Sequence, residues 1–174
     1  MKEIIIGFVL IIISLGGYSQ VQDVPKNNTH YLGFNAGSIS GIGLTYRFQP
    51  NKYGFQLTFL PIKAADYTWV SAGLMVSRKF KEGKYIDLNF YGGVHYLYNK
   101  YIQTNYFASN TPPYNGYFQE ETIIEEHFNF GGGLGFEFKI SNNFRINTHV
   151  GYGFYNQEFL NIYPAGELSM LYGF

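Results

Sequence analysis

The chain of 174 residues contains no cysteine and few charged residues. Without cysteine it can form no disulfide, no thiol nucleophile, no cysteine-ligated zinc site and no lipid anchor on a first mature cysteine. Lysine, arginine, aspartate and glutamate make up 14% of the chain, against about 25% in a typical soluble domain. Charged side chains usually cover a water-facing surface, so their shortage indicates that much of this surface faces something else.

Net charge is also absent, because 12 basic residues balance 12 acidic residues. A nucleic-acid-binding surface needs a basic patch, and no basic cluster occurs, so we expect no nucleic-acid partner. The mean hydropathy of −0.11 excludes a bundle of membrane helices.

The one long apolar run lies at the amino terminus. Lys2 supplies a positive charge, and residues 4–15 form an apolar core that is too short to span a bilayer as a helix. Gly17 and Ser19 are small residues placed before a cut at Gln20. We therefore expect a cleaved signal peptide at residues 1–19, a polar amino-terminal segment at 20–28 and one folded domain at 29–174.

Aromatic residues and glycine are abundant, with 17 tyrosines, 17 phenylalanines and 21 glycines. They occur in segments that alternate between apolar and polar residues, as in Ile42, Leu44, Tyr46 and Phe48 with Gly43, Thr45 and Arg47 between them. Alternation with a period of two predicts β-strands. Eight such segments follow one another, so the sequence predicts an all-β fold, an eight-stranded antiparallel up-and-down transmembrane β-barrel.

The connections between these segments alternate in length. Residues 49–52, 81–84 and 140–143 predict tight turns, whereas about 61–67, 100–121 and 157–164 predict longer loops; only the first outer loop, near residues 38–41, is short. Outer-membrane barrels have short periplasmic turns and longer outer loops. Aromatic residues flank the tight turns and end the chain, which predicts a periplasmic aromatic girdle of Phe48, Tyr53, Phe80, Tyr85, Phe138, Phe144 and Phe174.

The apolar rows could face either the inside or the outside of the barrel. A soluble barrel of the lipocalin type would point them inward, and a membrane barrel would point them toward lipid. The opposite rows consist mainly of glycine, asparagine, serine and threonine, which is too poor in charge for a water-exposed surface. Eight strands also enclose little room for so many large aromatic rings. The sequence therefore favours lipid-facing apolar rows.

The opposite rows then fill the interior, and they carry both signs of charge. Since an unpaired buried charge costs several kcal/mol, we expect a plugged lumen with a charge network and no porin-like aqueous channel. Arg145 is expected to pair with Glu137, its neighbour across a tight turn, or with Glu167. The predicted network contains Arg47, Asp87, Glu137, Arg145 and Glu167, and Lys79 and Lys139 lie on the same rows.

The leader, the alternation and the carboxyl-terminal Tyr172-Gly-Phe174 together resemble the small outer-membrane barrels typified by OmpX and the membrane domain of OmpA. Ser169 departs from the closing-strand pattern, which often has glycine there. The resemblance implies the outer membrane of a Gram-negative bacterium. It also implies contacts with outer-membrane lipid and lipopolysaccharide, and with barrel-insertion machinery that reads the terminal aromatic residue during biogenesis.

The sequence offers no catalytic, cofactor-binding or metal-binding residue set. Barrel-type lipid A deacylases use a histidine with a serine two positions later, but Gly151 follows His149 at that spacing. Barrel-type palmitoyltransferases use His, Asp and Ser; His30, Asp66 and Ser71 are the right types without a matching local sequence. The glycine run at 131–135 lacks the helix and lysine of a nucleotide loop.

Two features at the outer end have open interpretations. Glutamates with a histidine could bind a hard cation, but a solvated strand end is the simpler interpretation; these are Glu120, Glu121, Glu125, Glu126 and His127. Tyrosine among small polar residues makes a good contact surface, so residues 101–119 predict outer-loop contacts through Tyr101, Tyr106, Phe107, Tyr114, Tyr117 and Phe118. Alternation beyond Tyr98 and before Phe128 indicates that two strands continue above the membrane.

The favoured hypothesis is therefore a non-enzymatic barrel that acts in membrane structure, or in surface adhesion and interaction through its outer loops. OmpW-like passage of small apolar molecules is an alternative. A lipid A-modifying barrel enzyme is a third, disfavoured by the missing serine.

Overall fold

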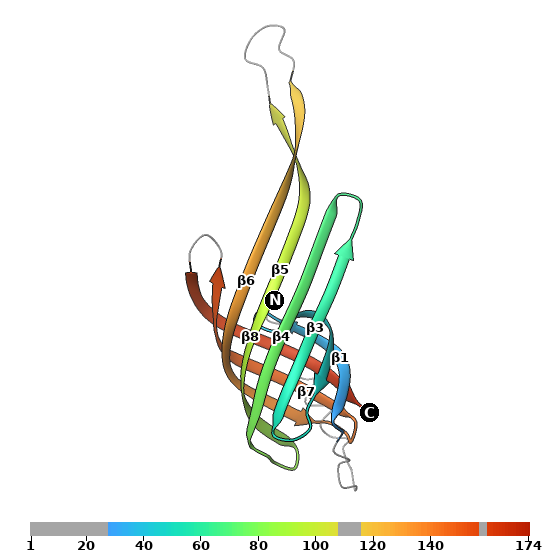
Figure 1. The fold of residues 1–174 in the computed structure, drawn as a ribbon, viewed down its shortest axis with the longest axis vertical. Helices are drawn as coiled ribbons and strands as arrows, with labels where there is room; N and C mark the ends of the chain where they lie inside the picture. Colours follow the sequence, from blue (N-terminus) through green and yellow to red (C-terminus); the bar gives the residue numbers. More distant parts are fainter. Residues whose placement is uncertain (1–27, 108–115, 157–159) are drawn as a thin grey trace, which may run out of the picture.

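The computed structural model describes residues 28–107, 116–156 and 160–174, which form a closed antiparallel barrel (Figure 1). Each strand pairs with the next along the chain, and the first pairs with the last. This confirms the predicted eight-stranded up-and-down barrel. The expected signal peptide and residues 20–27 lie outside the described residues. The strands are β1 (His30–Gly37), β2 (Gly41–Phe48), β3 (Tyr53–Lys63), β4 (Tyr67–Lys81), β5 (Ile86–Phe107), β6 (Tyr117–Lys139), β7 (Phe144–Asn156) and β8 (Leu160–Gly173).

Closure of the barrel depends on pairing between its two end strands. Leu32 of β1 lies opposite Tyr172 of β8. Phe174 N–H donates to the carbonyl of His30 at 3.1 Å, and Gly173 N–H donates to the carbonyl of Asn143 at 2.6 Å. The carboxyl terminus is therefore fixed to the neighbouring β1 strand and to the β6–β7 turn.

The apolar rows point outward. In β2, Leu44 is 70% exposed, whereas Thr45 and Arg47, which point to the other face, are each only 2% exposed. The same alternation of buried and exposed residues runs through all eight strands in the part of the barrel next to the tight turns. A polar interior and an apolar exterior are the reverse of a soluble barrel, so the lipocalin-type alternative is wrong. They are the interior and exterior of a small outer-membrane barrel.

The outer connections are shorter than the sequence suggested. Residues 64–66 join β3 to β4, where a loop over 61–67 was expected. β5 continues to Phe107 and β6 begins at Tyr117, so most of the expected 100–121 loop is strand. Likewise β8 already begins at Leu160. The polar residues in these stretches resembled loop sequence, but cross-strand backbone pairing continues through them because water can solvate both faces of a hairpin above the membrane.

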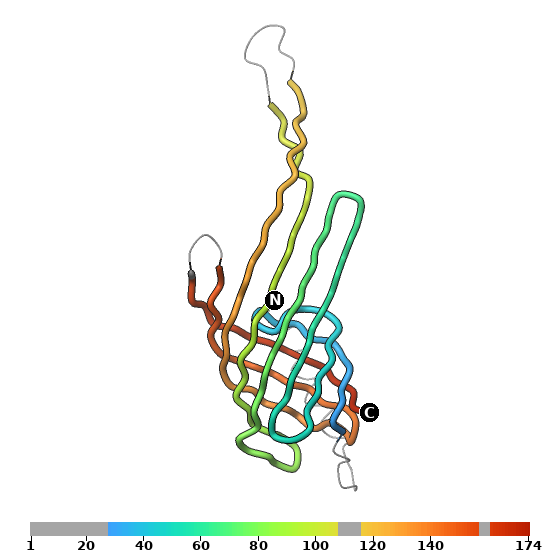
Figure 2. Tube along the Cα trace, in the orientation of Figure 1, coloured from blue at the N-terminus to red at the C-terminus, as the bar shows by residue number. Residues whose placement is uncertain are grey.

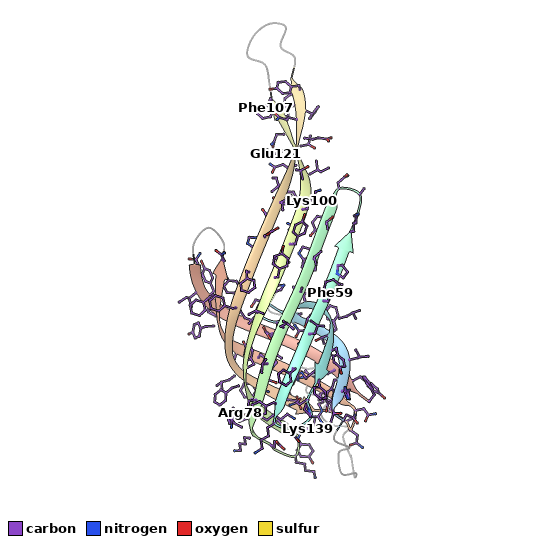
Figure 3. The ribbon with its side chains drawn as sticks, viewed as in Figure 1. Phe59, Arg78, Lys100, Phe107, Glu121 and Lys139 are labelled. Carbon is purple, nitrogen blue, oxygen red and sulfur yellow. The ribbon has the colours of Figure 1, made fainter. Side chains whose placement is uncertain are left out.

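The longer strands build a raised structure on one side of the barrel. The β3–β4 hairpin and the β5–β6 ribbon rise well beyond the β1–β2 end (Figures 1 and 2). We call the outer parts of these four strands the raised sheet: residues 60–63, 67–70, 97–107 and 117–128. Figure 3 places Phe107 and Glu121 near its top, and Arg78 and Lys139 at the opposite end of the molecule. Within the described ranges, no helix is long and apolar enough to cross a membrane.

Candidate functional site

Glu137 stands at the centre of the charge network in the periplasmic half of the lumen. Its Oε2 lies 3.2 Å from Arg47 Nη1, and its Oε1 lies 3.1 Å from Lys79 Nζ. Arg145 Nη1 also donates to Oε1. One carboxylate therefore receives three cations, from β2, β4 and β7. Arg47 is held further by Gln56, whose Oε1 accepts from Nε at 3.0 Å and from Nη2 at 2.7 Å.

Asp87 is the second carboxylate of this network. Its two oxygens lie 2.8 Å from Lys79 Nζ and 2.7 Å from Lys139 Nζ. The Gly83 N–H also donates to Asp87, at 3.1 Å, which ties the β4–β5 turn to the lumen. The structure thus brings together four of the five residues expected in the network, and it adds the two lysines.

Glu167, the fifth expected member, does not pair with Arg145. It lies toward the outer end, where Oε1 accepts from the N–H groups of Ile39 at 3.1 Å and Ser40 at 2.8 Å. Its Oε2 accepts from the Ser40 hydroxyl at 2.8 Å. Of the two carboxylates expected as partners of Arg145, Glu137 is therefore the one that it contacts. The short β1–β2 loop folds into the lumen and supplies the hydrogen bonds that an arginine was expected to make.

We call this loop, residues 38–40, the inner plug. Three lumen side chains hold Ser38. The Tyr155 hydroxyl donates to Ser38 Oγ at 2.8 Å, and His95 Nδ1 and Asn129 Nδ2 approach the Ser38 carbonyl at 3.2 and 3.5 Å. Four consecutive strands of the wall, β5 to β8, thus anchor one loop.

Ile39 closes the outer half of the lumen. It is fully buried and clusters with Met75, Tyr91 and Ala165. A Cβ added to Gly93 would lie 3.3 Å from the Ile39 side chain, so glycine leaves the space that Ile39 occupies. Gly41 has a φ of +85°, a conformation that favours glycine and lets the chain return to the wall as β2. A Cβ added to Gly131, in the glycine run at 131–135, would likewise lie 3.0 Å from the Ile39 side chain.

Ser71 and His95 form a serine–histidine pair in the lumen, and His149 Nδ1 lies 3.6 Å from Glu167 Oε2. Ser71 Oγ lies 2.9 Å from His95 Nε2. Because His95 Nδ1 faces the Ser38 carbonyl, it carries the proton, and Nε2 accepts from the serine hydroxyl. A nucleophile needs such a base, but Ser71 is fully buried behind the inner plug and also accepts from Ile42 N–H. The pair therefore stabilises the plug.

The structure does not assemble the other catalytic candidates. His149 is buried against the ring of Tyr91, with ring centroids 4.6 Å apart. His30 lies at the periplasmic end, where Nδ1 is 2.7 Å from the Tyr46 hydroxyl. Asp66 lies in the β3–β4 connection at the opposite end, and its backbone carbonyl accepts from Ile102 N–H. His30 and Asp66 therefore cannot act together on one substrate.

The residues of the expected girdle lie at the end of the barrel that carries the tight turns. Phe48, Tyr53, Phe80, Tyr85 and Phe174 are exposed, whereas Phe138 and Phe144 are half-buried. His30 joins them, since its ring lies 5.1 Å from that of Phe48 and 6.0 Å from that of Phe174. Rings at one height suit the bilayer interface.

The residues expected to make outer-loop contacts lie on strands. Tyr106 and Phe118 face each other across the β5–β6 ribbon with ring centroids 5.1 Å apart, and Phe107 and Tyr117 do so at 5.6 Å. Because neighbouring residues of a strand point to opposite faces, the two pairs put aromatic rings on both sides of the ribbon. Tyr114 lies outside the described residues.

The glutamates of the raised sheet do not gather into one site. Glu120 and Glu126 alternate with Glu121 and Glu125, so the ribbon places two on each face. Across the described ranges, no three acidic, histidine or cysteine side chains form a group that could hold a metal. Glu125 instead accepts from the Tyr101 hydroxyl at 3.1 Å, and this hydrogen bond raises the pKa of Tyr101. Tyr101 is thus less free for contacts than the tip aromatics.

Replacing Glu167 by alanine tests the plug. Two buried N–H groups would lose their acceptor, and an unsatisfied buried donor costs about 1–3 kcal/mol. Hydrogen exchange at the amides of Ile39 and Ser40, measured in nanodiscs, should accelerate about tenfold or more. Glu126→Ala on the raised sheet is the matched control and should leave both rates unchanged. Equal exchange rates in the two variants would contradict the assigned role of Glu167.

Several solved barrels share this architecture, whereas neither protein-family models nor curated proteins give a match. The N-terminal β-barrel domain of OprF from Pseudomonas aeruginosa is 12% identical, with a TM-score of 0.48 over 83% of this chain and 95% of that one. The attachment invasion locus protein Ail of Yersinia pestis is 16% identical, with a TM-score of 0.40 over 83% of this chain and 93% of that one.

Sequence reasoning missed several lumen residues. Tyr31, Met75, Tyr91 and Leu171 are apolar or aromatic, yet they point inward and are buried. Their positions in the alternation could have identified Tyr31 and Tyr91, which each sit between outward residues. Nothing in the sequence indicated that Ile39 turns inward, because a loop residue has no strand periodicity.

Proposed function

We propose that this protein is a non-enzymatic barrel of the outer membrane of a Gram-negative bacterium that binds a surface partner through its raised sheet. Residues 1–19 would serve as its export leader. The single observation that carries the proposal is the outer edge of β6. Among the described residues, which leave out 157–159, pairing between β6 and β7 begins at Asn129 and Tyr155, and residues 117–128 pair with β5 alone. We call this stretch the free edge.

A free edge has a row of unpaired backbone donors and acceptors. Proteins normally shield such an edge, because another extended chain can add to it as a further strand. Here the edge is long, stands above the membrane and carries the exposed rings of Tyr117 and Phe118. Backbone pairing would supply affinity, and the rings would supply side-chain contacts.

The charge of the raised ribbon indicates the kind of partner. Residues 97–107 and 117–128 contain one lysine and four glutamates, a net charge of −3 with histidine neutral. Lys100 is the lysine, and it lies on β5, away from the free edge. Charge complementarity therefore favours an extended partner segment with basic side chains.

The alternative functions lack support of this kind. Passage of small apolar molecules needs an open apolar vestibule, but in the described part of the barrel Ile39 and its neighbours fill the outer lumen. Lipid A modification needs an accessible nucleophile, and Ser71 is buried. Uptake of an apolar dye into liposomes and lipid A mass profiles with and without the protein would test these two alternatives.

Adhesion assays with a shortened ribbon test the proposal. Replacing residues 101–123, which begin and end at the register pair Tyr101↔Ile123, by a tight turn removes most of the free edge and the tip aromatics. It should reduce binding of the nanodisc-embedded barrel to cells about tenfold or more. Tyr117→Ser with Phe118→Ser should weaken it in the same direction. Tyr85→Ser, which truncates an equally exposed ring at the periplasmic end, is the control and should bind normally.

The charge component needs its own comparison. Glu120→Lys with Glu121→Lys should weaken binding and reduce its dependence on salt. Lys84→Glu, which reverses an exposed charge in the β4–β5 turn at the periplasmic end, should do neither. If the shortened barrel still folds and binds cells as well as the unmodified one, the raised sheet is not the interaction surface.

A further inference from the structure

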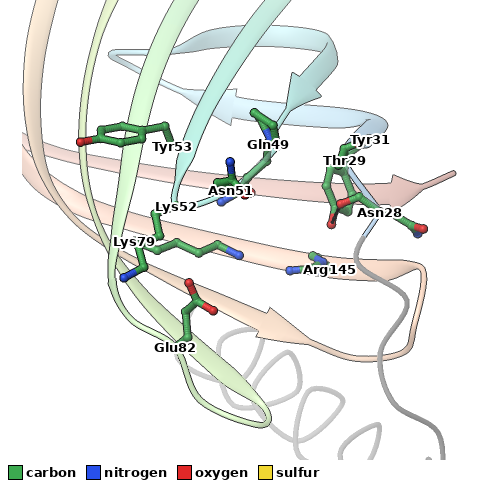
Figure 4. A pocket seen from close by; sticks show the side chains of 11 residues that line it. Asn28, Thr29, Tyr31, Gln49, Asn51, Lys52, Tyr53, Lys79, Glu82 and Arg145 are labelled. Carbon is green, nitrogen blue, oxygen red and sulfur yellow. Dashed lines mark hydrogen bonds between the residues drawn. The ribbon is translucent and has the colours of Figure 1, made fainter.

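The periplasmic end of the lumen opens into a polar pocket of about 490 Å³ (Figure 4). Lys52, Lys79, Glu82 and Arg145 contribute its charged side chains, and Asn28, Thr29, Tyr31, Gln49 and Asn51 contribute polar ones. The pocket is distinct from the raised sheet, which lies at the opposite end of the barrel. Its size is that of a small-molecule site, whereas the lumen above it is filled by side chains.

The wall of this pocket has an excess of buried positive charge. The network behind it contains four cations, Arg47, Lys79, Lys139 and Arg145, and two carboxylates, Asp87 and Glu137. Each cation contacts one of the two carboxylates, and the six groups together carry a net charge of +2. At the rim, Lys52 and Glu82 cancel each other. Because an uncompensated buried charge is costly, the pocket favours an anion that enters from the periplasmic side.

Arg145 shows this imbalance in its hydrogen bonds. Its Nη1 donates to Glu137, and its guanidinium carbon lies 5.0 Å from the centre of the Tyr31 ring. The Arg145 side chain is only 5% exposed, and its Nε is buried without a hydrogen-bond partner in the structure. A guanidinium normally directs its parallel N–H groups at the two oxygens of a carboxylate or phosphate.

We propose that this pocket binds an oxyanion, the carboxylate or phosphate of a periplasmic molecule. Lys79 and Arg145 supply the charge at its inner wall, Lys52 supplies charge at the rim, and the amides of Asn28 and Asn51 are further donors. The volume exceeds that of a bare phosphate ion, so the anionic group is carried on a larger organic molecule such as a sugar phosphate or a short peptide acid. This proposal does not depend on the function of the raised sheet.

Titration of the full barrel in neutral-lipid nanodiscs tests the proposal. Glucose 6-phosphate, inorganic phosphate and a dipeptide carboxylate are added separately, and backbone amide resonances of Asn51 and Lys52 are followed with the Arg145 Nε–H resonance. Saturable shifts are expected with at least one of the organic anions, and tighter binding than for inorganic phosphate. Nanodiscs containing phosphatidylglycerol, with no added solute, determine whether a lipid headgroup supplies the oxyanion instead.

Rim variants keep the test independent of folding. Lys52→Gln should weaken binding about fivefold. Glu82→Gln should strengthen it about threefold, because Glu82 is the only acidic residue among the described residues that line the pocket. A gain of affinity cannot arise from misfolding. Lys63→Gln, which removes an exposed lysine at the outer end, should leave the affinity unchanged. Resonance shifts that grow linearly with ionic strength for every salt, without saturation, would overturn the proposal. Equal affinities in all three variants would also overturn it.

Discussion

Replacing Glu137 by alanine should destabilise the barrel by about 3–5 kcal/mol, because three buried cations in the lumen would lose the carboxylate that they contact. Glu137 is 1% exposed and contacts Arg47, Lys79 and Arg145. Lys79 would keep Asp87, but Arg47 would keep only the neutral Gln56. The lost carboxylate would also increase the excess of buried positive charge from two to three.

Chemical unfolding in lipid vesicles, followed through the single tryptophan, Trp69, would measure this loss. Glu120→Ala removes a glutamate from the exposed ribbon and should change stability by no more than about 0.5 kcal/mol. Glu137→Gln separates the effect of the lost charge from that of the lost side-chain volume. It keeps the shape of the side chain but removes its charge, and it should still be strongly destabilising. If alanine at 137 costs no more than alanine at 120, the network does not hold the lumen together.

The second large effect concerns the outer wall. Leu44→Arg should cost about 2–4 kcal/mol in a bilayer, because it places a charge on the lipid-facing side of the barrel. Leu44 is 70% exposed and lies opposite Phe34 of β1 and Phe59 of β3, in the middle of an apolar surface. A protein exterior in water would accept arginine there at almost no cost.

Ile124→Arg is the matched control. Ile124 is also an exposed aliphatic residue, 56% exposed, but it belongs to the raised sheet above the membrane. We expect it to leave the unfolding midpoint nearly unchanged. Similar small effects at positions 44 and 124 would mean that water, and not hydrocarbon, surrounds the barrel wall.

The elements that sequence predicted well have local causes. Period-two alternation fixed the faces of β2 and β3, because an apolar residue two positions from another must share its side of a strand. The tight turns at 49–52 and 140–143 were recognisable from polar residues between aromatic rows. Proximity in sequence also explains why the Glu137–Arg145 contact was among the expected pairs, since a four-residue turn joins their strands.

The elements that sequence predicted poorly depend on distant neighbours. Within the loops expected at 61–67 and 157–164, residues 61–63, 67 and 160–164 lie in strands, because backbone pairing across a hairpin does not require apolar residues. Glu167 lacks an arginine partner, because residues 38–40 fold inward from the opposite end of the chain and occupy its oxygens. No pattern within either segment indicates this contact.

By itself, the sequence determined that eight strands form and which face of each meets lipid, because both follow from the spacing of side chains along one strand. Only the tertiary structure decided how the lumen is filled, which cations share Glu137 and that, among the described residues, 117–128 of β6 pair with β5 alone. These properties depend on which strand ends stand side by side when the barrel closes, and closure joins β1 to β8 across the whole length of the chain.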